Sequence, residues 1–101
     1  MFNFGFKLRY AKRAPGWSKV RNEYLKKNNR CASCGTTNDL EVHHIKPVHI
    51  FPDLELEENN LITLCSKKCH LLFGHLMNFK SWNPDVIEDC KKMYKKIENR
   101  K

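Results

Sequence analysis

The sequence predicts a small α+β domain of 101 residues, in which two short strands lie between helices. Two runs, LEVHHI at 40–45 and NLITLC at 60–65, have the length and the β-branched composition of strands. Apolar residues recur at helical spacing toward both ends of the chain. Four cysteines form two close pairs that flank the strands. Because a chain of this length buries only a modest core, a metal that ties the pairs together is physically plausible.

The N-terminal part predicts an arm and then a helix. Residues 1–16, MFNFGFKLRYAKRAPG, are basic and aromatic and end in a Pro-Gly break. The aromatic residues of this arm suit packing onto the domain better than stacking on bases. Trp17, Val20 and Tyr24 then recur at helical spacing, with lysine and arginine between them. We expect an arm over residues 1–16 and a single domain over residues 17–101.

The central elements alternate between turns and strands. Residues 31–35 form a cysteine knuckle, and the TTND that follows has turn chemistry. The first strand, at 40–45, is followed by a proline-containing loop that leads to the second strand at 60–65. The run SKKCHLLFGHLM, at 66–77, predicts a short helix in spite of its glycine.

The C-terminal part predicts a second long helix. Asn83 has the character of an N-cap residue, and Pro84 suits the first helical position. The apolar stripe of this helix is Val86, Cys90, Met93 and Ile97. Because Cys90 lies on the stripe, we expect it to be a core thiol and not a metal ligand.

The net charge of +8 is distributed unevenly. Residues 1–35 carry +8, residues 36–65 carry −5 and residues 66–101 carry +5. Basic flanks suit a polyphosphate ligand, because each lysine or arginine that neutralises a phosphate releases a condensed counterion. A solvated basic surface accounts for the same charge without a ligand.

The apolar content of the sequence excludes an integral membrane protein. No stretch approaches the roughly 20 apolar residues that a membrane-spanning helix needs. The chain also begins without the apolar run of a secretion signal, so its CxxC spacing indicates intracellular metal chemistry more readily than disulfides. We therefore expect a cytoplasmic protein with no membrane partner.

The two cysteine pairs predict a structural zinc site. Cys31 and Cys34 form a CxxC pair, and Cys65 and Cys69 form a CxxxC pair. Four thiolates satisfy Zn²⁺ without leaving a coordination position open. A single CxxC pair is also found in redox motifs, but two pairs around a strand–loop–strand unit are more specific for metal. The second pair has one more intervening residue than the first, so Cys69 departs from the even CxxC/CxxC pattern.

The remaining polar cluster suggests a catalytic site. It consists of His43, His44, Asn60, His70 and His75. Phosphodiester hydrolysis needs a water nucleophile, an acceptor for its proton and positive charge near the developing negative charge. A neutral imidazole can accept the proton, and an ion held by two or three histidines keeps positions open for substrate. The alternative is a set of unrelated histidines, some buried and satisfied and the others on the surface. Adjacent strand residues point to opposite faces, so His43 and His44 can serve one site only if the strand ends or kinks there.

Several of these motifs resemble those of the HNH endonucleases. The similar segments are CASCG, LEVHHIKPVHIFPDLEL, NNLITLC and CHLLFGH, within a resemblance that covers about residues 9–90. The resemblance implies the ββα-metal fold, also called the His-Me finger, in the version stapled by a four-cysteine zinc. It implies that His43 is a metal ligand, that His44 is the general base and that Asn60 holds the loop and helps to orient the base.

The resemblance also implies that His70 is a metal ligand carried by a helix. Some members of the family have a further ligand four residues later, whereas here His75 is five residues later and follows Gly74. Five residues of a regular helix rotate a side chain by about 140°. Either Gly74 distorts the helix, or His75 is not a co-ligand.

Together, the residues and the resemblance predict a metal-dependent endonuclease that hydrolyses DNA phosphodiester bonds with His44 as general base. Its expected cofactors are a structural zinc and one catalytic divalent ion, either Mg²⁺, Mn²⁺, Ni²⁺ or Zn²⁺. The expected partner is DNA, and phage packaging or restriction proteins are candidate protein partners. The alternative is a non-catalytic zinc module that binds nucleic acid or a protein. The candidates for DNA phosphate contacts are Arg9, Lys12, Arg13, Lys19, Arg21 and Lys80.

Overall fold

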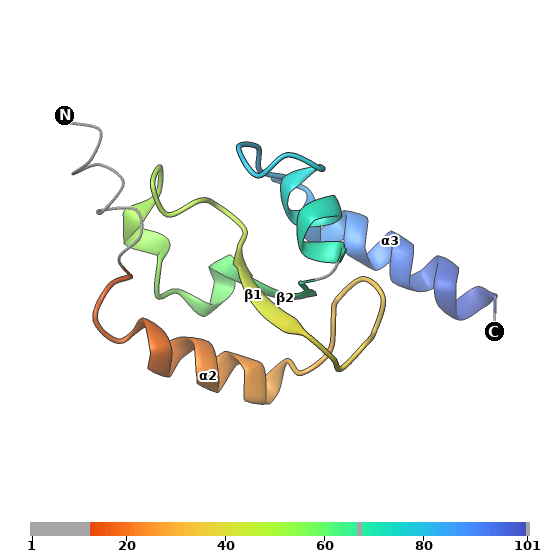
Figure 1. Cartoon of the computed structure of the whole chain (residues 1–101), viewed down its shortest axis with the longest axis horizontal. Helices are drawn as coiled ribbons and strands as arrows, with labels where there is room; N and C mark the ends of the chain where they lie inside the picture. The colour runs from red at the N-terminus through yellow and green to blue at the C-terminus, as the bar shows by residue number, and fades with distance from the viewer. Residues whose placement is uncertain (1–12, 67, 101) are drawn as a thin grey trace.

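A computed structural model describes residues 13–66 and 68–100 of the chain. Most of the expected N-terminal arm, including Arg9 and Lys12, lies outside the described residues. The main elements are helix α2 (Trp17–Lys27), strands β1 (Leu40–His44) and β2 (Leu61–Cys65), the short π-helix η3 (His70–Gly74) and helix α3 (Val86–Asn99) (Figure 1). The predicted small α+β architecture is confirmed. In the described part of the chain, no helix is both long and apolar enough to cross a membrane.

Helix α2 packs along β1 and is tied to the start of β2 (Figure 1). It begins after Gly16, whose φ of 91° lies in the left-handed region that favours glycine. The hydroxyl of Tyr24 donates a hydrogen bond of 2.9 Å to the carbonyl oxygen of Leu61. The apolar stripe of α2 is only half-buried, so the helix is a cover for the strands and not the centre of the core.

The two strands form an antiparallel hairpin with a long connection. The register pairs Leu40 with Cys65 and His44 with Leu61. The connection contains two short 3-10 turns, η1 (Pro52–Leu54) and η2 (Glu58–Asn60). Every residue of β2 is buried, because this strand is covered on both faces. The first strand ends at His44, one residue earlier than predicted.

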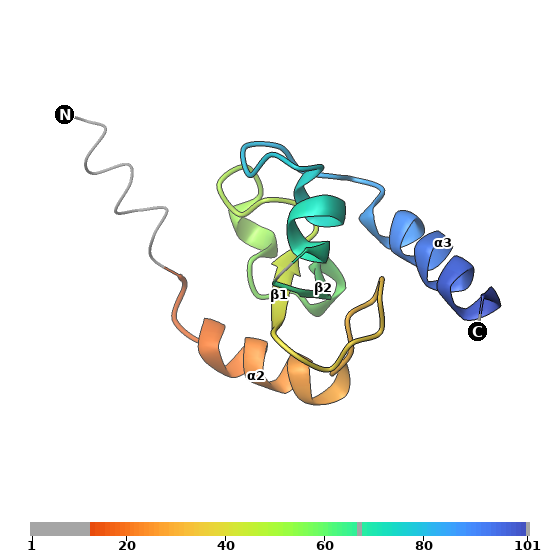
Figure 2. The same ribbon diagram turned by 45° about the vertical axis from the view of Figure 1, so that its right-hand side comes forward.

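The core is small and lies between β2, η3 and the start of α3. Leu64 and Val86 are fully buried at its centre, and Cys90 is 1% exposed. The prediction that Cys90 is a core thiol is therefore confirmed. Burial raises the pKa of Cys90 to about 12, so its thiol stays protonated at neutral pH. Figure 2 shows α3 running outward from this core, away from the two strands.

Two predictions about the C-terminal half were wrong in detail. The expected short helix at 66–77 contains a π-helix of five residues, η3. The last helix begins at Val86 and not at Pro84. Residues 84–85 form a turn before this helix, and the buried side chain of Asn83 is bonded on several sides. It accepts from the Asp85 backbone N–H and donates to the Phe73 carbonyl and the Asp89 carboxylate, each at 2.9 Å, which ties α3 to η3.

Candidate metal centres and active site

The four paired cysteines converge on one point. The sulfur atoms of Cys31, Cys34, Cys65 and Cys69 all lie within 4.8 Å of one another, and the sulfurs of Cys34 and Cys65 are 3.9 Å apart. Four sulfurs at about 2.3 Å around a tetrahedral Zn²⁺ lie about 3.8 Å from each other. Cys69 belongs to this cluster in spite of its extra spacing. The geometry and the donor type both fit zinc.

Local backbone geometry shapes the first knuckle. The Gly35 N–H donates to the Cys31 carbonyl oxygen at 2.9 Å, and the Cys34 N–H points at the Cys31 sulfur at 3.5 Å. Gly35 has a φ of 80°, which favours glycine. Burial raises the pKa of Cys65, but the hydrogen bonds from the backbone of Cys69 and Lys68 bring it down to about 7. A thiol of this kind readily becomes the thiolate that a metal binds.

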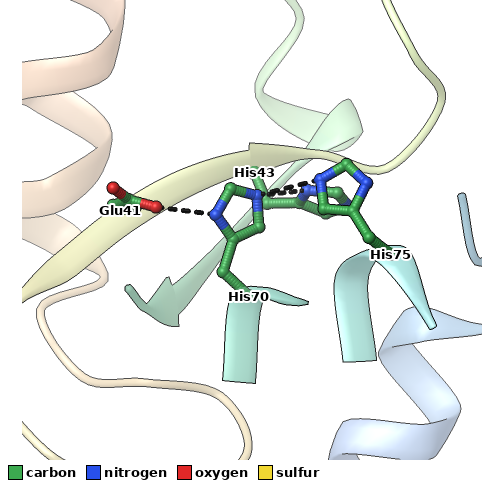
Figure 3. Close-up of polar contacts among 4 residues, drawn as sticks. All are labelled: Glu41, His43, His70 and His75. Atoms are coloured by element: carbon green, nitrogen blue, oxygen red, sulfur yellow. Dashed lines mark hydrogen bonds and ion pairs between the residues drawn. The ribbon is translucent and has the colours of Figure 1, made fainter. Parts of the chain in front are cut away.

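Three histidines form a second cluster. His43 comes from β1, His70 is the first residue of η3, and His75 directly follows its last residue (Figure 3). One ring nitrogen from each lies within 4.8 Å of the others. The Nε2 atom of His70 is 3.0 Å from Nδ1 of His43 and 3.3 Å from Nε2 of His75. The structure thus brings together the three residues that were expected, or considered, as ligands of a catalytic ion.

The π-helix explains how His75 reaches the cluster. In a π-helix the backbone hydrogen bonds run between residues five apart, so His70 and His75 face the same side. Gly74 makes room for this arrangement. An ideal Cβ at Gly74 would lie 3.0–3.1 Å from three atoms of the His43 ring, so a glycine lets the ring rest against the backbone. Of the two alternatives that the sequence left open, the structure shows a distorted helix.

Hydrogen bonds on the outer side of the cluster define which ring nitrogens can bind a cation. Nδ1 of His70 is 2.6 Å from a carboxylate oxygen of Glu41, and Nδ1 of His75 is 2.8 Å from the Ser81 carbonyl oxygen. Because an ionised carboxylate and a carbonyl only accept hydrogen bonds, Nδ1 carries the hydrogen in both rings. In neutral rings, two Nε2 lone pairs then face each other across 3.3 Å.

A divalent cation fits this donor set. Two facing lone pairs repel each other unless a positive charge lies between them. Two imidazole nitrogens bound to one ion at about 2.1 Å are about 3.0–3.4 Å apart, which matches the spacings of 3.0 Å and 3.3 Å in the cluster. Nδ1 of His43, which lies 3.0 Å from Nε2 of His70, is the nitrogen that would bind this ion, whereas Nε2 of His43 is buried and has no hydrogen-bond partner among the described residues. The protein alone therefore does not satisfy these rings.

The electrostatics of the cluster favour neutral imidazoles. Burial, followed by repulsion from His70 and His75, lowers the pKa of His43 to about 3. Burial also lowers the pKa of His75. A neutral imidazole is the form that binds a metal ion, so the rings of His43 and His75 need not lose protons at neutral pH.

His44 occupies a separate position beside the cluster. It is the last residue of β1, is 8% exposed and packs against Trp17 with ring centroids 4.6 Å apart. Its Nε2 lies 2.9 Å from the carbonyl oxygen of Glu55. The carbonyl can only accept, so Nε2 carries the hydrogen and Nδ1 keeps a free lone pair in the neutral ring. Burial lowers the pKa of His44 although the hydrogen bond to Glu55 opposes this, so the ring is neutral at pH 7.

Asn60 holds the loop between the strands. Its side-chain oxygen accepts from the Lys46 N–H at 2.8 Å, and its amide donates to the carbonyl oxygens of Lys46 at 3.1 Å and Leu54 at 3.3 Å. These bonds fix both ends of the loop at 46–54. The next residue, Glu55, supplies the carbonyl that orients His44. These bonds connect Asn60 to His44 through the loop.

All four of these histidines line one open pocket of about 820 Å³. The adjacent residues His43 and His44 share the pocket, which is possible because β1 ends at His44. Two of the expected phosphate-contacting residues, Arg13 and Lys80, also line it. The other two that the structure describes, Lys19 and Arg21, lie on α2 outside the pocket lining.

Several residues that support the site were not predicted from the sequence: Trp17, Glu41, Glu55 and Ser81. The carboxylate of Glu55 is buried and accepts from the Ala14 N–H at 2.9 Å, which holds the chain before α2 against the pocket. A signal existed only for Glu41. It lies two residues before His43, and residues two apart in a strand share a face.

Residues 31–74 match the model of the HNH endonuclease family. The match begins at Cys31 and ends one residue before His75. Within it lie β1, β2, η3 and all four cysteines, an arrangement consistent with the ββα-metal fold. No curated protein and no solved structure matches the chain.

Proposed function

Since residues 31–74 match the model of the HNH endonuclease family, we propose that this protein is a metal-dependent endonuclease that hydrolyses DNA phosphodiester bonds. One observation carries the proposal. A single pocket presents three imidazoles arranged for one cation and, beside them, a fourth imidazole with a free basic nitrogen. This combination meets the two requirements of phosphodiester hydrolysis that side chains and an ion supply, which are charge stabilisation and proton removal.

The chain's own residues divide the chemical roles. His44 takes the proton of the attacking water at Nδ1, and its bond to the Glu55 carbonyl stabilises the imidazolium that forms. Contact with Trp17 keeps the ring in place. His43, His70 and His75 would hold a divalent ion such as Mg²⁺, Mn²⁺, Ni²⁺ or Zn²⁺. When bound, this ion supplies Lewis-acid stabilisation of the charge on the phosphate and the leaving oxygen.

The four-cysteine site has a structural role in this proposal. It joins the knuckle at Cys31 to the end of β2 and to Cys69, which directly precedes His70. A zinc there would fix the position of η3 relative to the strands, and thereby the spacing of the histidines. Because four thiolates leave no coordination position open, this ion takes no part in the reaction.

The DNA contacts follow from the distribution of charge. Arg13 and Lys80 line the pocket and would hold the phosphates beside the cleaved bond. Lys19 and Arg21 on α2 would contact phosphates farther along the duplex, as would Arg9 and Lys12 from the proposed arm at residues 1–16. Contacts of this kind position a protein without specifying a sequence. The single domain at residues 17–101 and the protein partners, phage packaging or restriction proteins, stay predictions.

The alternative function, a non-catalytic zinc module, explains the cysteines and the charge. It gives no purpose to the free Nδ1 of His44 or to the convergence of three other histidines. A plasmid-nicking assay with and without a divalent metal separates the two functions. No nicking with any of the four metals would contradict the endonuclease.

The pair His43 and His44 allows a sharper test. His43→Ala should weaken binding of the catalytic ion. His44→Ala should leave binding of this ion and of DNA nearly intact but lower the nicking rate by about 10²–10⁴-fold, as is typical for loss of a general base. Zinc content should stay the same in both variants, because neither residue belongs to the thiolate cluster. An active His44→Ala protein would rule out this residue as the essential base.

A further inference from the structure

Glu41 makes a short contact with one of the three clustered histidines. Its Oε1 atom lies 2.6 Å from Nδ1 of His70, although the two residues are 29 positions apart in the sequence (Figure 3). His75 instead faces the Ser81 carbonyl, and Nε2 of His43 has no partner among the described residues. Within the cluster, the carboxylate contact thus distinguishes His70.

The position of Glu41 follows from the strand. Glu41 and His43 are two residues apart in β1 and therefore share a face of the hairpin. The same face of β1 thus presents one histidine of the cluster and one carboxylate to η3, where His70 is the first residue. His70 meets both, with its Nε2 at His43 and its Nδ1 at Glu41.

The usual reasons for a glutamate in a strand do not account for Glu41. Glutamate has a low preference for strands, and the Glu41 side chain is 48% exposed, so it contributes little to packing. An exposed ion pair also contributes little to stability. What the contact does provide is geometry, because it determines where the hydrogen of the His70 ring lies and how the ring is turned.

We propose that Glu41 is a positioning residue of the three-histidine centre. Its carboxylate holds His70 with the hydrogen on Nδ1, so that the lone pair of Nε2 points at the site of the ion. A carboxylate in this position also increases the electron density of the imidazole and strengthens its bond to a metal. The inference rests on the proposed role of the histidine cluster as a binding site for a divalent metal.

The first test measures Mn²⁺ affinity directly by calorimetry, without DNA. Glu41→Ala should bind Mn²⁺ about 10–100-fold more weakly, the range for loss of a group that orients a ligand. Glu41→Gln keeps an oxygen that accepts a hydrogen bond and should lose less. The control is Glu57→Gln, which removes the same charge from an exposed glutamate outside the pocket lining and should bind like the wild type. Equal losses for Glu41→Gln and Glu41→Ala would overturn the proposal.

A double-mutant cycle separates positioning from a general effect of charge. If Glu41 acts through the ring of His70, then Glu41→Ala should cause no further loss of Mn²⁺ affinity in a His70→Ala protein. A loss that persists without His70 would show that the carboxylate acts on the cation at a distance, and this result would overturn the proposal. Zinc content and the unfolding temperature, measured on each preparation, show that the variants are folded.

The last test needs neither metal nor substrate. In the metal-free wild type, ¹⁵N NMR of the histidine side chains should show the hydrogen of His70 on Nδ1, and Glu41→Ala should give a mixture of the two tautomers. A wild-type ring with its hydrogen on Nε2 would overturn the proposal. A protein that nicks no DNA but shows these tautomer and affinity changes would contradict the proposed nuclease function and leave the role of Glu41 intact.

Discussion

Replacing Gly74 with alanine tests whether the His43 ring rests on the backbone of η3. An ideal Cβ at this position would lie 3.0 Å from Cε1 of His43 and 3.1 Å from each of its ring nitrogens, whereas ordinary contacts begin at 3.4 Å. Gly74 does not have a positive φ, so the backbone itself accepts alanine. The methyl group must therefore push the buried ring away by a few tenths of an ångström.

The expected energy is a balance of two effects. In an open helical position, alanine in place of glycine stabilises a protein by about 1 kcal/mol. Overpacking of a buried site costs about 1–3 kcal/mol, so we expect a net loss of between zero and about 2 kcal/mol. The distance between a metal ion and a ligand atom can depart from its usual value by only about 0.2 Å, which is less than the expected shift of the His43 ring. Affinity for Mn²⁺ should fall by about tenfold or more.

Urea unfolding and Mn²⁺ titration of Gly74→Ala measure both effects. The matched background is His43→Ala, in which the ring is absent and the steric conflict disappears. There Gly74→Ala should stabilise the protein by up to about 1 kcal/mol, a reversal of sign relative to the wild type. If Gly74→Ala stabilised the protein with His43 present and left Mn²⁺ affinity unchanged, the packing of this ring against η3 would be refuted.

Three further predictions concern zinc, DNA and pH. The purified protein should carry about one tightly bound zinc per chain, and Cys34→Ser or Cys65→Ser should lose both zinc and folded structure; a folded protein without zinc would contradict this. Arg13→Ala and Lys80→Ala should each weaken DNA binding similarly for all sequences and reduce the slope of its salt dependence by about one. Unchanged binding across a salt titration would show that these two residues of the pocket lining do not contact phosphate. Because burial lowers the pKa of His44 and the neutral ring is the base, the nicking rate should fall as the pH is lowered, with its half-maximal value below pH about 6.5. A half-maximal value above pH about 7 would speak against His44.

The sequence by itself determined the parts of this protein that depend on local spacing. The cysteine pairs could be assigned to one site because knuckles are local structures, with only two or three residues between their ligands. The strands and the two long helices could be predicted because their side chains repeat with the period of the element. The core position of Cys90 followed from the same periodicity.

Only the tertiary structure decided the arrangement around the histidines. The spacing of His70 and His75 was compatible with two outcomes, since it places them together in a π-helix and apart in an α-helix. The π-helix η3 forms where Gly74 lets the ring of His43, on strand β1, approach the backbone. This contact joins residues that are far apart in the sequence, so no local sequence pattern predicts it. The hydrogen-bond partners of His44 and His70 were also decided by the tertiary structure. The Glu55 carbonyl group and the Glu41 carboxylate orient these rings only because the folded chain brings them close.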